Sequence, residues 1–330
     1  MTGRQEHSEI MDAKTKKLLI GQSKILTDYY YSFTDNSSFT KKAYIKYVIE
    51  FFGYLKANGI AVSIDELKDL KTSDINRYMD AVKYTTRGGE RIERKEVSRA
   101  VRLYAISNFF EFMIDEGYMS TNPCARVDAP KCSEEKEIVA MTPKDIKLLK
   151  KNIINGVGST RSISENKKWI NRNLAIVSLG CTTGLRVSSI TEINISDIDF
   201  QNQTIIVREK GNKERTIYFG ENTKKELLDW LADRRRLFPG IDTDALFISK
   251  KRKRLSQRSI ADMLEHYSVG INKHITPHKM RSSCATNLYE KTGDIYLVQQ
   301  TLGHKNIANT RRYAKLSEER RRKAVELLDK

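Results

Sequence analysis

The fold of this chain is decided by residues 169–188, which read WINRNLAIVSLGCTTGLRVS. From Trp169 to Leu179 apolar residues fall on most faces of a helix, and a helix that is apolar all round is typically buried in a core. Gly184 then permits a tight turn that directs the next side chains outward. The segment therefore predicts a buried helix, a glycine turn and an outward-facing Arg186.

After this segment the pattern changes to short alternating runs that are typical of strands. The predicted strands are Ile193 to Phe200, Thr204 to Arg208 and Arg215 to Phe219, with Lys210-Gly211-Asn212 at the tip between the last two. The flanking sequence is helical in pattern, and one helix is expected to begin at Thr142-Pro143 because threonine favours the N-cap and proline the first helical position. The expected fold is mainly α with a small antiparallel β-sheet.

The N-terminal half shows helix patterns only. Between Ser38 and Asn58 the apolar residues recur at i, i+3, i+4, i+7, i+8 and i+11, which is one face of a helix. Ser37 or Ser38 is placed to cap its start. Further helices are predicted from Thr72 onward and from Lys95 to Glu116. Because no convincing strand is found in this half, we expect an all-helical domain.

Prolines and a charged run separate the two halves. Pro123, Pro130 and the charged segment Lys131 to Glu137 break the helix pattern and predict an interdomain linker. The expected organisation is a polar N-terminal extension at 1–22, a helical domain at 23–122, a linker at 123–139, a second domain at 140–316 and a C-terminal helix at 317–330.

Composition indicates a polyanionic partner. The 330 residues carry 59 Lys and Arg against 42 Asp and Glu, for a net charge of +17. An excess of this size concerns binding partners rather than fold. Nucleic acid binds strongly basic proteins favourably, because its phosphates release their counterions when lysine and arginine neutralise them.

Cysteine usage and hydropathy bear on the compartment. The four cysteines, Cys124, Cys132, Cys181 and Cys284, are scattered without a Cys-x-x-Cys pair, so they predict neither a metal knuckle nor a disulfide framework. The N-terminus is too polar for a signal peptide. No apolar run approaches the roughly 20 residues of a membrane span. We expect a cytoplasmic protein without a membrane partner.

Several scattered residues are candidates for phosphate chemistry. His278 and Arg281 lie three residues apart after the helix-starting pair Thr276-Pro277, so they share one face near a helix N-terminus, where anions bind favourably. Lys210 lies at the predicted strand tip, His304 follows Leu302-Gly303, and Tyr313 comes nine residues later. Taken singly, each of these is more often an ordinary surface or core residue.

Their order along one domain is more specific than any one of them. Arg186-Val187-Ser188, Lys210 some 24 residues later, His278-x-x-Arg281, Leu302-Gly303-His304 and Tyr313 together resemble the catalytic signature of the tyrosine recombinases, which include the phage integrases and the Xer-type resolvases. Residues Val97 to Pro123 resemble the last helices of that family's core-binding domain. Two positions depart from the family's usual pattern: Ser189 stands where an acid is frequent, and Ser282 where histidine is frequent.

The resemblance implies a site-specific recombinase that cuts and rejoins DNA. Tyr313 would attack the scissile phosphate and form a 3′-phosphotyrosyl link, while Arg186 and Arg281 would clamp the non-bridging oxygens with their planar forks. Lys210 would protonate the leaving 5′-oxygen. His278 would accept the tyrosine proton or bind the phosphate, and His304 would donate to a non-bridging oxygen. The resemblance implies no cofactor and no metal.

The same resemblance implies the partners. These are double-stranded DNA carrying an inverted-repeat site and three further copies of the chain, which form a homotetramer on two DNA sites. An accessory directionality factor or a second recombinase stays open. Candidate DNA contacts are basic residues of both domains: Lys41, Lys42, Lys46, Arg94, Lys95, Arg99, Arg102, Lys250, Lys251 and Arg252.

Two other functions share parts of this pattern. A type IB topoisomerase uses the same chemistry without site preference, and an inactive relative would bind DNA only as an accessory protein. The Xer-like helical domain disfavours the first and the complete set of six residues disfavours the second. Since only some 20 residues precede the helical block, no arm-binding domain is expected. Integration or excision of a mobile element and resolution of chromosome or plasmid multimers both stay open.

Overall fold

The computed structural model describes residues 3–34, 37–131, 138–208, 214–313, 325–326 and 329. The chain divides into two compact units, one of which is Gln5–Glu134 and the other Glu135–Lys330 with Thr2–Arg4. Each unit has its own hydrophobic core. No helix in the described part of the chain is both long and apolar enough to cross a membrane.

The N-terminal part of the chain is built mainly of helices. They are α1 (Gly3–Leu19), α2 (Lys24–Ser32), α3 (Ser38–Ala57), α4 (Ile64–Lys68), α5 (Thr72–Ala81) and α6 (Glu96–Asp115). The three predicted helices correspond to α3, α5 and α6. Ser37 caps α3 as expected, because its hydroxyl accepts a hydrogen bond from the N–H of Thr40 at 3.2 Å.

Aromatic side chains fill the core of the first unit. Phe51 packs edge-on against Tyr78 with ring centroids 4.9 Å apart, and Phe52 packs in the same way on Phe109 at 5.4 Å. Edge-to-face pairs of this kind stabilise a core by about 0.5–1.5 kcal/mol beyond their buried area. Because these rings come from α3, α5 and α6, they hold together the three helices that the sequence predicts.

One expectation for this part of the chain is wrong, and one helix was not predicted. The unit is not all helical, since β1 (Tyr84–Arg87) and β2 (Glu90–Glu93) pair as an antiparallel hairpin. The turn between them is Gly88-Gly89, and both glycines have positive φ, at 60° and 86°. A two-residue turn of this geometry favours Gly-Gly. Residues expected as a polar extension instead form α1, whose apolar residues do not gather on one face, so periodicity does not reveal it.

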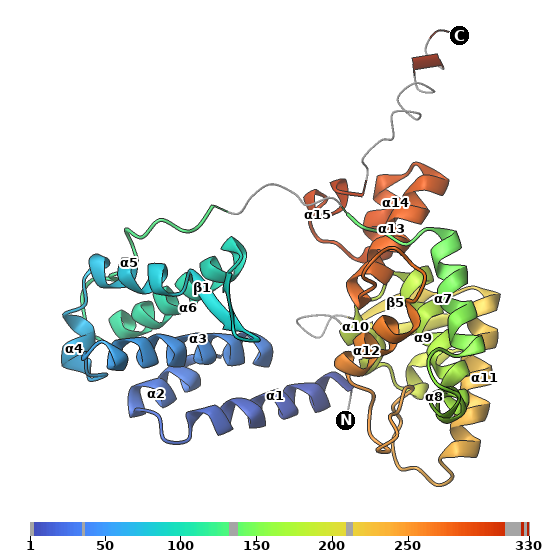
Figure 1. Cartoon of the computed structure of the whole chain (residues 1–330), viewed down its shortest axis with the longest axis horizontal. Helices are drawn as coiled ribbons and strands as arrows, with labels where there is room; N and C mark the ends of the chain where they lie inside the picture. Colours follow the sequence, from blue (N-terminus) through green and yellow to red (C-terminus); the bar gives the residue numbers. More distant parts are fainter. Residues whose placement is uncertain are drawn as a thin grey trace. The chain divides into compact units, whose positions relative to one another are not determined.

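The second unit places the predicted buried helix at its centre. Helix α9 (Ile170–Thr183) packs against α7 (Pro143–Asn155), α11 (Glu221–Leu237) and α13 (Pro277–Thr292), as Figure 1 shows. Ala175, Ile176, Val177 and Leu179 of α9 are fully buried, which confirms the prediction from residues 169–188. The other elements are α8 (Thr160–Asn166), α10 (Val187–Glu192), α12 (Gln257–Tyr267), α14 (Ile295–Leu302), α15 (Ala308–Arg311) and the short 3-10 helices Lys167–Trp169 and Ile195–Asp197.

A small antiparallel sheet completes this unit. Its strands β3 (Ile198–Asp199), β4 (Thr204–Arg208) and β5 (Glu214–Tyr218) are ordered β3-β4-β5. The strand predicted from Ile193 to Phe200 is wrong over most of its length. There the Asp197 carboxylate accepts a hydrogen bond from the N–H of Asn194 at 2.8 Å, which caps a 3-10 turn and leaves only two residues to pair.

Three predictions fall outside the described residues. The strand tip that carries Lys210 lies at 209–213, and most of the predicted linker's charged run lies at 132–137. Of the predicted C-terminal helix at 317–330, the structure describes only residues 325, 326 and 329.

Candidate active site

The start of α13 supplies two of the predicted residues. Thr276 is the N-cap and Pro277 the first helical residue, although the Thr276 hydroxyl makes no capping hydrogen bond. One turn separates His278, which is exposed, from Arg281, which is only 3% exposed. The helix therefore presents a histidine at the surface and inserts the arginine beneath it.

Arg281 binds the carboxyl ends of two other helices. Its Nη1 donates to the carbonyl oxygen of Gly184 at 2.5 Å, and its Nη2 donates to that of Leu302 at 2.7 Å. Gly184 ends α9 and Leu302 is the last residue of α14. Since the last carbonyls of a helix lack partners within it and carry partial negative charge, the buried guanidinium satisfies them while they offset its charge.

The turn at Gly184 requires a glycine. Its φ is +63°, which is the left-handed region, and a Cβ there would lie 2.6 Å from Cδ2 of Leu302. Arg186 follows as the N-cap of α10 and is exposed, as the sequence predicts. Among the described residues its guanidinium has no hydrogen-bond partner, so it is available to a ligand.

His304 and Tyr313 lie side by side after α14. The rings are stacked with centroids 6.3 Å apart and planes 18° apart. Nδ1 of His304 lies 3.0 Å from the hydroxyl of Thr310, which is fully buried. The Tyr313 N–H donates to the Thr310 carbonyl at 2.9 Å. Tyr313 itself is 6% exposed and packs with Ala285 and Leu302.

Positive charge dominates the electrostatics of this site. Burial lowers the pKa of His304 to about 4, with further lowering by the charges of Arg281 and Arg186. Burial likewise lowers the pKa of Arg281 to about 10, which leaves it charged at neutral pH, and Arg186 adds to the effect. Partial burial lowers the pKa of His278, and the charge of Arg312 is the next cause. Both histidines are therefore neutral at pH 7.

The site contains five of the six predicted catalytic residues. Arg186, His278, Arg281, His304 and Tyr313 come from the segments around α10, α13, α14 and α15. Burial and the charges of Arg186 and Arg281 lower the pKa of both histidines, and His304 stacks on Tyr313, so the five lie within one neighbourhood. The sixth, Lys210, lies outside the described residues. Within the described chain, neither Arg186 nor Arg281 has a carboxylate partner. A site with this excess of cations is suited to an anion.

Three further residues at the site were missed from the sequence. Arg215 of β5 donates to the carbonyl of Thr301 at 3.0 Å, and its charge lowers the pKa values of Arg281 and His304. Thr310 and Arg312 precede the nucleophile candidate Tyr313 by three residues and one residue. Arg215 ends the Lys-Gly-Asn-Lys-Glu-Arg segment that contributes to the family signature, so that motif is the signal that would have found it.

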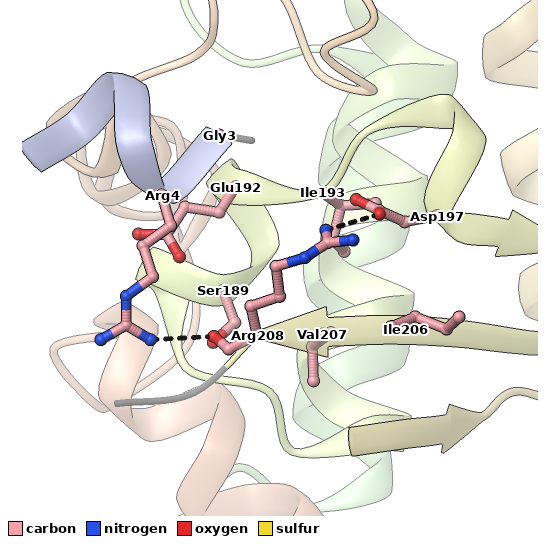
Figure 2. A pocket seen from close by; sticks show the side chains of 9 residues that line it. All are labelled: Gly3, Arg4, Ser189, Glu192, Ile193, Asp197, Ile206, Val207 and Arg208. Atoms are coloured by element: carbon pink, nitrogen blue, oxygen red, sulfur yellow. Dashed lines mark hydrogen bonds and ion pairs between the residues drawn. The ribbon is translucent and has the colours of Figure 1, made fainter. Parts of the chain in front are cut away.

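A small pocket lies next to this site but has no room for a substrate. Figure 2 shows Ser189 and Glu192 of α10 beside Ile206 and Arg208 of β4, where Arg208 Nη1 pairs with Asp197 Oδ1 at 2.8 Å. The cavity measures about 10 Å³, which holds at most one water molecule. Ser189, which stands where the family frequently has an acid, therefore lines this small pocket beside the Arg208–Asp197 ion pair.

Comparison with known proteins identifies the family. The family model described as the phage integrase family matches residues 137–320. The chain belongs to the phage integrase family. It is 32% identical to the tyrosine recombinase XerC of Mannheimia succiniciproducens over 257 residues, which is 76% of this chain and 82% of the relative. It is 34% identical to XerC of Escherichia coli O157:H7 over 222 residues, which is 66% of this chain and 70% of the relative.

Solved structures of the same fold bind DNA. XerH bound to a palindromic difH substrate, in a post-cleavage complex, matches with a TM-score of 0.65 at 19% identity over 89% of this chain and 81% of XerH. A lambda integrase dimer bound to a COC′ core site matches with a TM-score of 0.62 at 19% identity over 88% of this chain and 94% of that one. These matches confirm the predicted fold.

The predicted activity class is also confirmed. The protein is a tyrosine site-specific recombinase, an enzyme that breaks and rejoins DNA strands. Neither the topoisomerase nor the inactive accessory protein finds support among these relatives.

One candidate DNA contact, Arg102, is paired with an acid inside the protein. Arg102 is 8% exposed, and its Nε pairs with the Glu50 carboxylate at 3.1 Å while Nη1 donates to Ser98. This guanidinium stabilises the contact between α3 and α6, and the Glu50 carboxylate offsets its charge, which disfavours a role in binding phosphate. Arg94 also pairs with Glu50, at 3.3 Å, but its side chain stays 18% exposed.

The other candidate DNA contacts lie at or near the surface. Lys41 is half-buried and donates to the carbonyl of Phe33 at 2.6 Å. Lys42 and Arg99 are also half-buried. The fully exposed candidates are Lys46, Lys95, Lys250, Lys251 and Arg252.

Proposed function

We propose that Tyr313 is the nucleophile of the recombinase and that Arg186 and Arg281 bind the scissile phosphate. The phenolic oxygen attacks phosphorus, the 3′-phosphotyrosyl bond forms, and the bond to the 5′-oxygen breaks. Negative charge grows on the non-bridging oxygens as this happens, and fixed guanidinium groups stabilise it. The proposal is supported by one observation above all: the stacked His304–Tyr313 pair lies near Arg186 and Arg281, neither of which has a carboxylate partner in the described chain.

The proton transfers follow from the same electrostatics. A phenol is mostly protonated at neutral pH, so attack needs a base. His278 is neutral because its pKa is lowered, and it takes that proton. If the Thr310 hydroxyl donates to Nδ1 of His304, the proton of the neutral ring is on Nε2, from which it is donated to a phosphate oxygen. Lys210 supplies the proton for the leaving 5′-oxygen.

Access to Tyr313 requires local movement. Its side chain is 6% exposed and packs on Leu302, so a phosphodiester cannot reach the phenol as it lies. The segment from Gly303 to Tyr313 contains only the four-residue helix α15, which ends at Arg311. We propose that this segment shifts when DNA occupies the site.

The substrate is duplex DNA with an inverted-repeat site, bound by the predicted helical domain at 23–122 and the predicted second domain at 140–316. The exposed cations of both units contact the backbone, which fixes position more than sequence. Four protomers act on two sites, and the tail at 317–330 docks on a neighbouring protomer. The biological role is integration and excision of a mobile element, or resolution of chromosome or plasmid multimers, with or without an accessory factor or a second recombinase.

A nicked suicide substrate tests the chemistry. The duplex is recovered from a pool of randomised fragments by covalent trapping on the native protein, and the covalent band is measured on a denaturing gel. Tyr313→Phe should abolish the band, since phenylalanine lacks the attacking oxygen, while Tyr296→Phe, which changes an exposed tyrosine of α14, should keep it. A band that persists in Tyr313→Phe assigns the nucleophile elsewhere. The genomic positions of trapped protein separate the mobile-element role from the resolvase role.

A further inference from the structure

Arg312 is a cation at the site that the family signature leaves without a role. It directly precedes Tyr313 and is the C-cap residue of α15, with backbone angles φ −58° and ψ −22°. Its side chain is half-buried, and its Nε is fully buried without a hydrogen-bond partner. It has no carboxylate partner among the described residues. This distinguishes it from Arg102, Arg208 and Arg94, each of which pairs with an acid.

The charge of Arg312 acts on both histidines of the site. Its charge lowers the pKa of His278 more than the charges of Arg281 and Arg186 do. It lowers the pKa of His304 as well, where Arg281 has the larger effect. Arg312 is thus within electrostatic range of both histidines, and one peptide bond joins it to Tyr313, whose ring stacks on His304. It therefore borders the space where a phosphate would lie.

A partly buried guanidinium with an unpaired N–H is unfavourable in the absence of an anion. We propose that Arg312 is a third phosphate-binding arginine, whose guanidinium binds a non-bridging oxygen of the scissile phosphodiester from within the nucleophile's own segment. The inference rests on the proposed nucleophilic role of Tyr313. Since one peptide bond joins the two residues, a phosphate held by Arg312 also draws the Tyr313 segment toward it.

Phosphate binding at Arg312 also acts on His278. In the free protein the positive charge of Arg312 makes the His278 ring a weaker base. The negative charge of a bound phosphodiester offsets that effect, so the ring becomes a stronger base when the substrate is present. His278 then accepts the tyrosine proton more readily in the complex than in the free protein.

The proposal is tested by removing the charge of Arg312, the charge of the scissile phosphate, or both. Single-turnover formation of the covalent complex is measured on the trapped nicked duplex, once with a normal scissile phosphate and once with a methylphosphonate, which lacks one charged non-bridging oxygen. The variants are Arg312→Ala, Arg312→Gln and Arg312→Lys. Arg311→Ala is the matched control, because Arg311 is the adjacent arginine and is exposed. Thermal melting by circular dichroism verifies folding, and the glutamine variant serves if the alanine variant does not fold.

The expected result is a selective loss. Arg312→Ala should slow cleavage of the phosphodiester by roughly 10- to 100-fold relative to native protein, while the two proteins should cleave the methylphosphonate within about 3-fold of each other. Arg312→Lys should be intermediate, because it keeps the charge without the fork. Equal losses on both substrates would reveal a merely structural residue and overturn the proposal, as would native-like cleavage by Arg312→Ala. Absence of any Tyr313-dependent band in the native protein would instead overturn the proposed function itself.

Discussion

Arg281→Lys should cost the recombinase folding stability as well as cleavage, whereas Arg186→Lys should cost cleavage alone. The two arginines have the same proposed role but opposite surroundings. Arg281 is 3% exposed and bridges the carbonyls of Gly184 and Leu302 through two different nitrogens. A lysine has one nitrogen and reaches only one of them. Arg186 is exposed and bridges nothing within the described chain.

The magnitude follows from the carbonyl that Arg281→Lys leaves unpaired. A buried polar group without a partner costs about 1–3 kcal/mol, and a domain's whole stability is about 5–15 kcal/mol. With a urea m-value of about 2 kcal/mol/M, a loss of about 2 kcal/mol lowers the unfolding midpoint by about 1 M. Arg186→Lys should stay within about 0.5 kcal/mol of native, as exposed substitutions do.

The chain offers a convenient probe for this measurement. Its two tryptophans, Trp169 and Trp230, are both buried in the core of the second unit, at 3% and 0% exposed. Their fluorescence during urea unfolding therefore reports on the unit that contains Arg281. Cleavage is measured in parallel on the nicked duplex. An Arg281→Lys protein that unfolds at the native urea concentration would refute the stabilising role of the carbonyl contacts, and an equally destabilised Arg186→Lys would refute the contrast.

Three further predictions concern the turns and hydrogen bonds around the site. Gly184→Ala should lower the free energy of unfolding by about 2–3 kcal/mol in the same urea assay, because φ is +63° and the methyl group would lie 2.6 Å from Leu302; a native midpoint would contradict this. The pKa of His304 is about 4 in the folded protein and ordinarily near 6.5, so the unfolded chain binds a proton at a higher pH than the folded protein does. The free energy of unfolding should therefore fall by about 1 kcal/mol as the pH drops from about 6.5 to 4, a value reduced because solvent screens this partly exposed ring. His304→Gln should flatten that part of the pH profile, and an unchanged slope would exclude the histidine as its source. Thr310→Val removes the hydroxyl 3.0 Å from Nδ1 of His304 and should slow covalent-complex formation by about 10-fold without lowering the melting temperature; full activity in that variant would show that Thr310 does not orient the ring.

Periodicity predicted the parts of the fold in which burial is continuous along the sequence. Residues 169–188 are apolar on most helix faces, and the helix they form is the centre of the second unit. The same reasoning missed α1, because its few apolar residues do not gather on one face and leave no pattern to detect. It missed the hairpin at Tyr84–Glu93 because β2 is exposed along its length, so no alternation marks it. Only the Gly88-Gly89 turn signalled it.

The ordered motifs identified five residues that the structure brings together, but their individual environments were not predictable. Nothing near Arg281 in sequence shows that it is buried, since its partners Gly184 and Leu302 are 97 and 21 residues away. The pairing of Arg102 depends in the same way on Glu50, 52 residues distant. Spacing along a helix predicts which residues share a face, whereas only tertiary packing decides which of them is paired.

The positions of Gly184 and Gly303 explain how the fold assembles this site. Each glycine ends a helix in the left-handed conformation, α9 in one case and α14 in the other, and each is followed within two residues by a member of the proposed site, Arg186 or His304. The helix ends meet at Arg281, whose guanidinium donates a hydrogen bond to each of the two carbonyl oxygens. Because the carboxyl end of a helix carries partial negative charge, it stabilises a buried guanidinium without neutralising it as a carboxylate would. The charge of Arg281 therefore stays available to a phosphate. A carboxylate in the place of either carbonyl would hold the arginine as firmly, but it would also compete with the substrate.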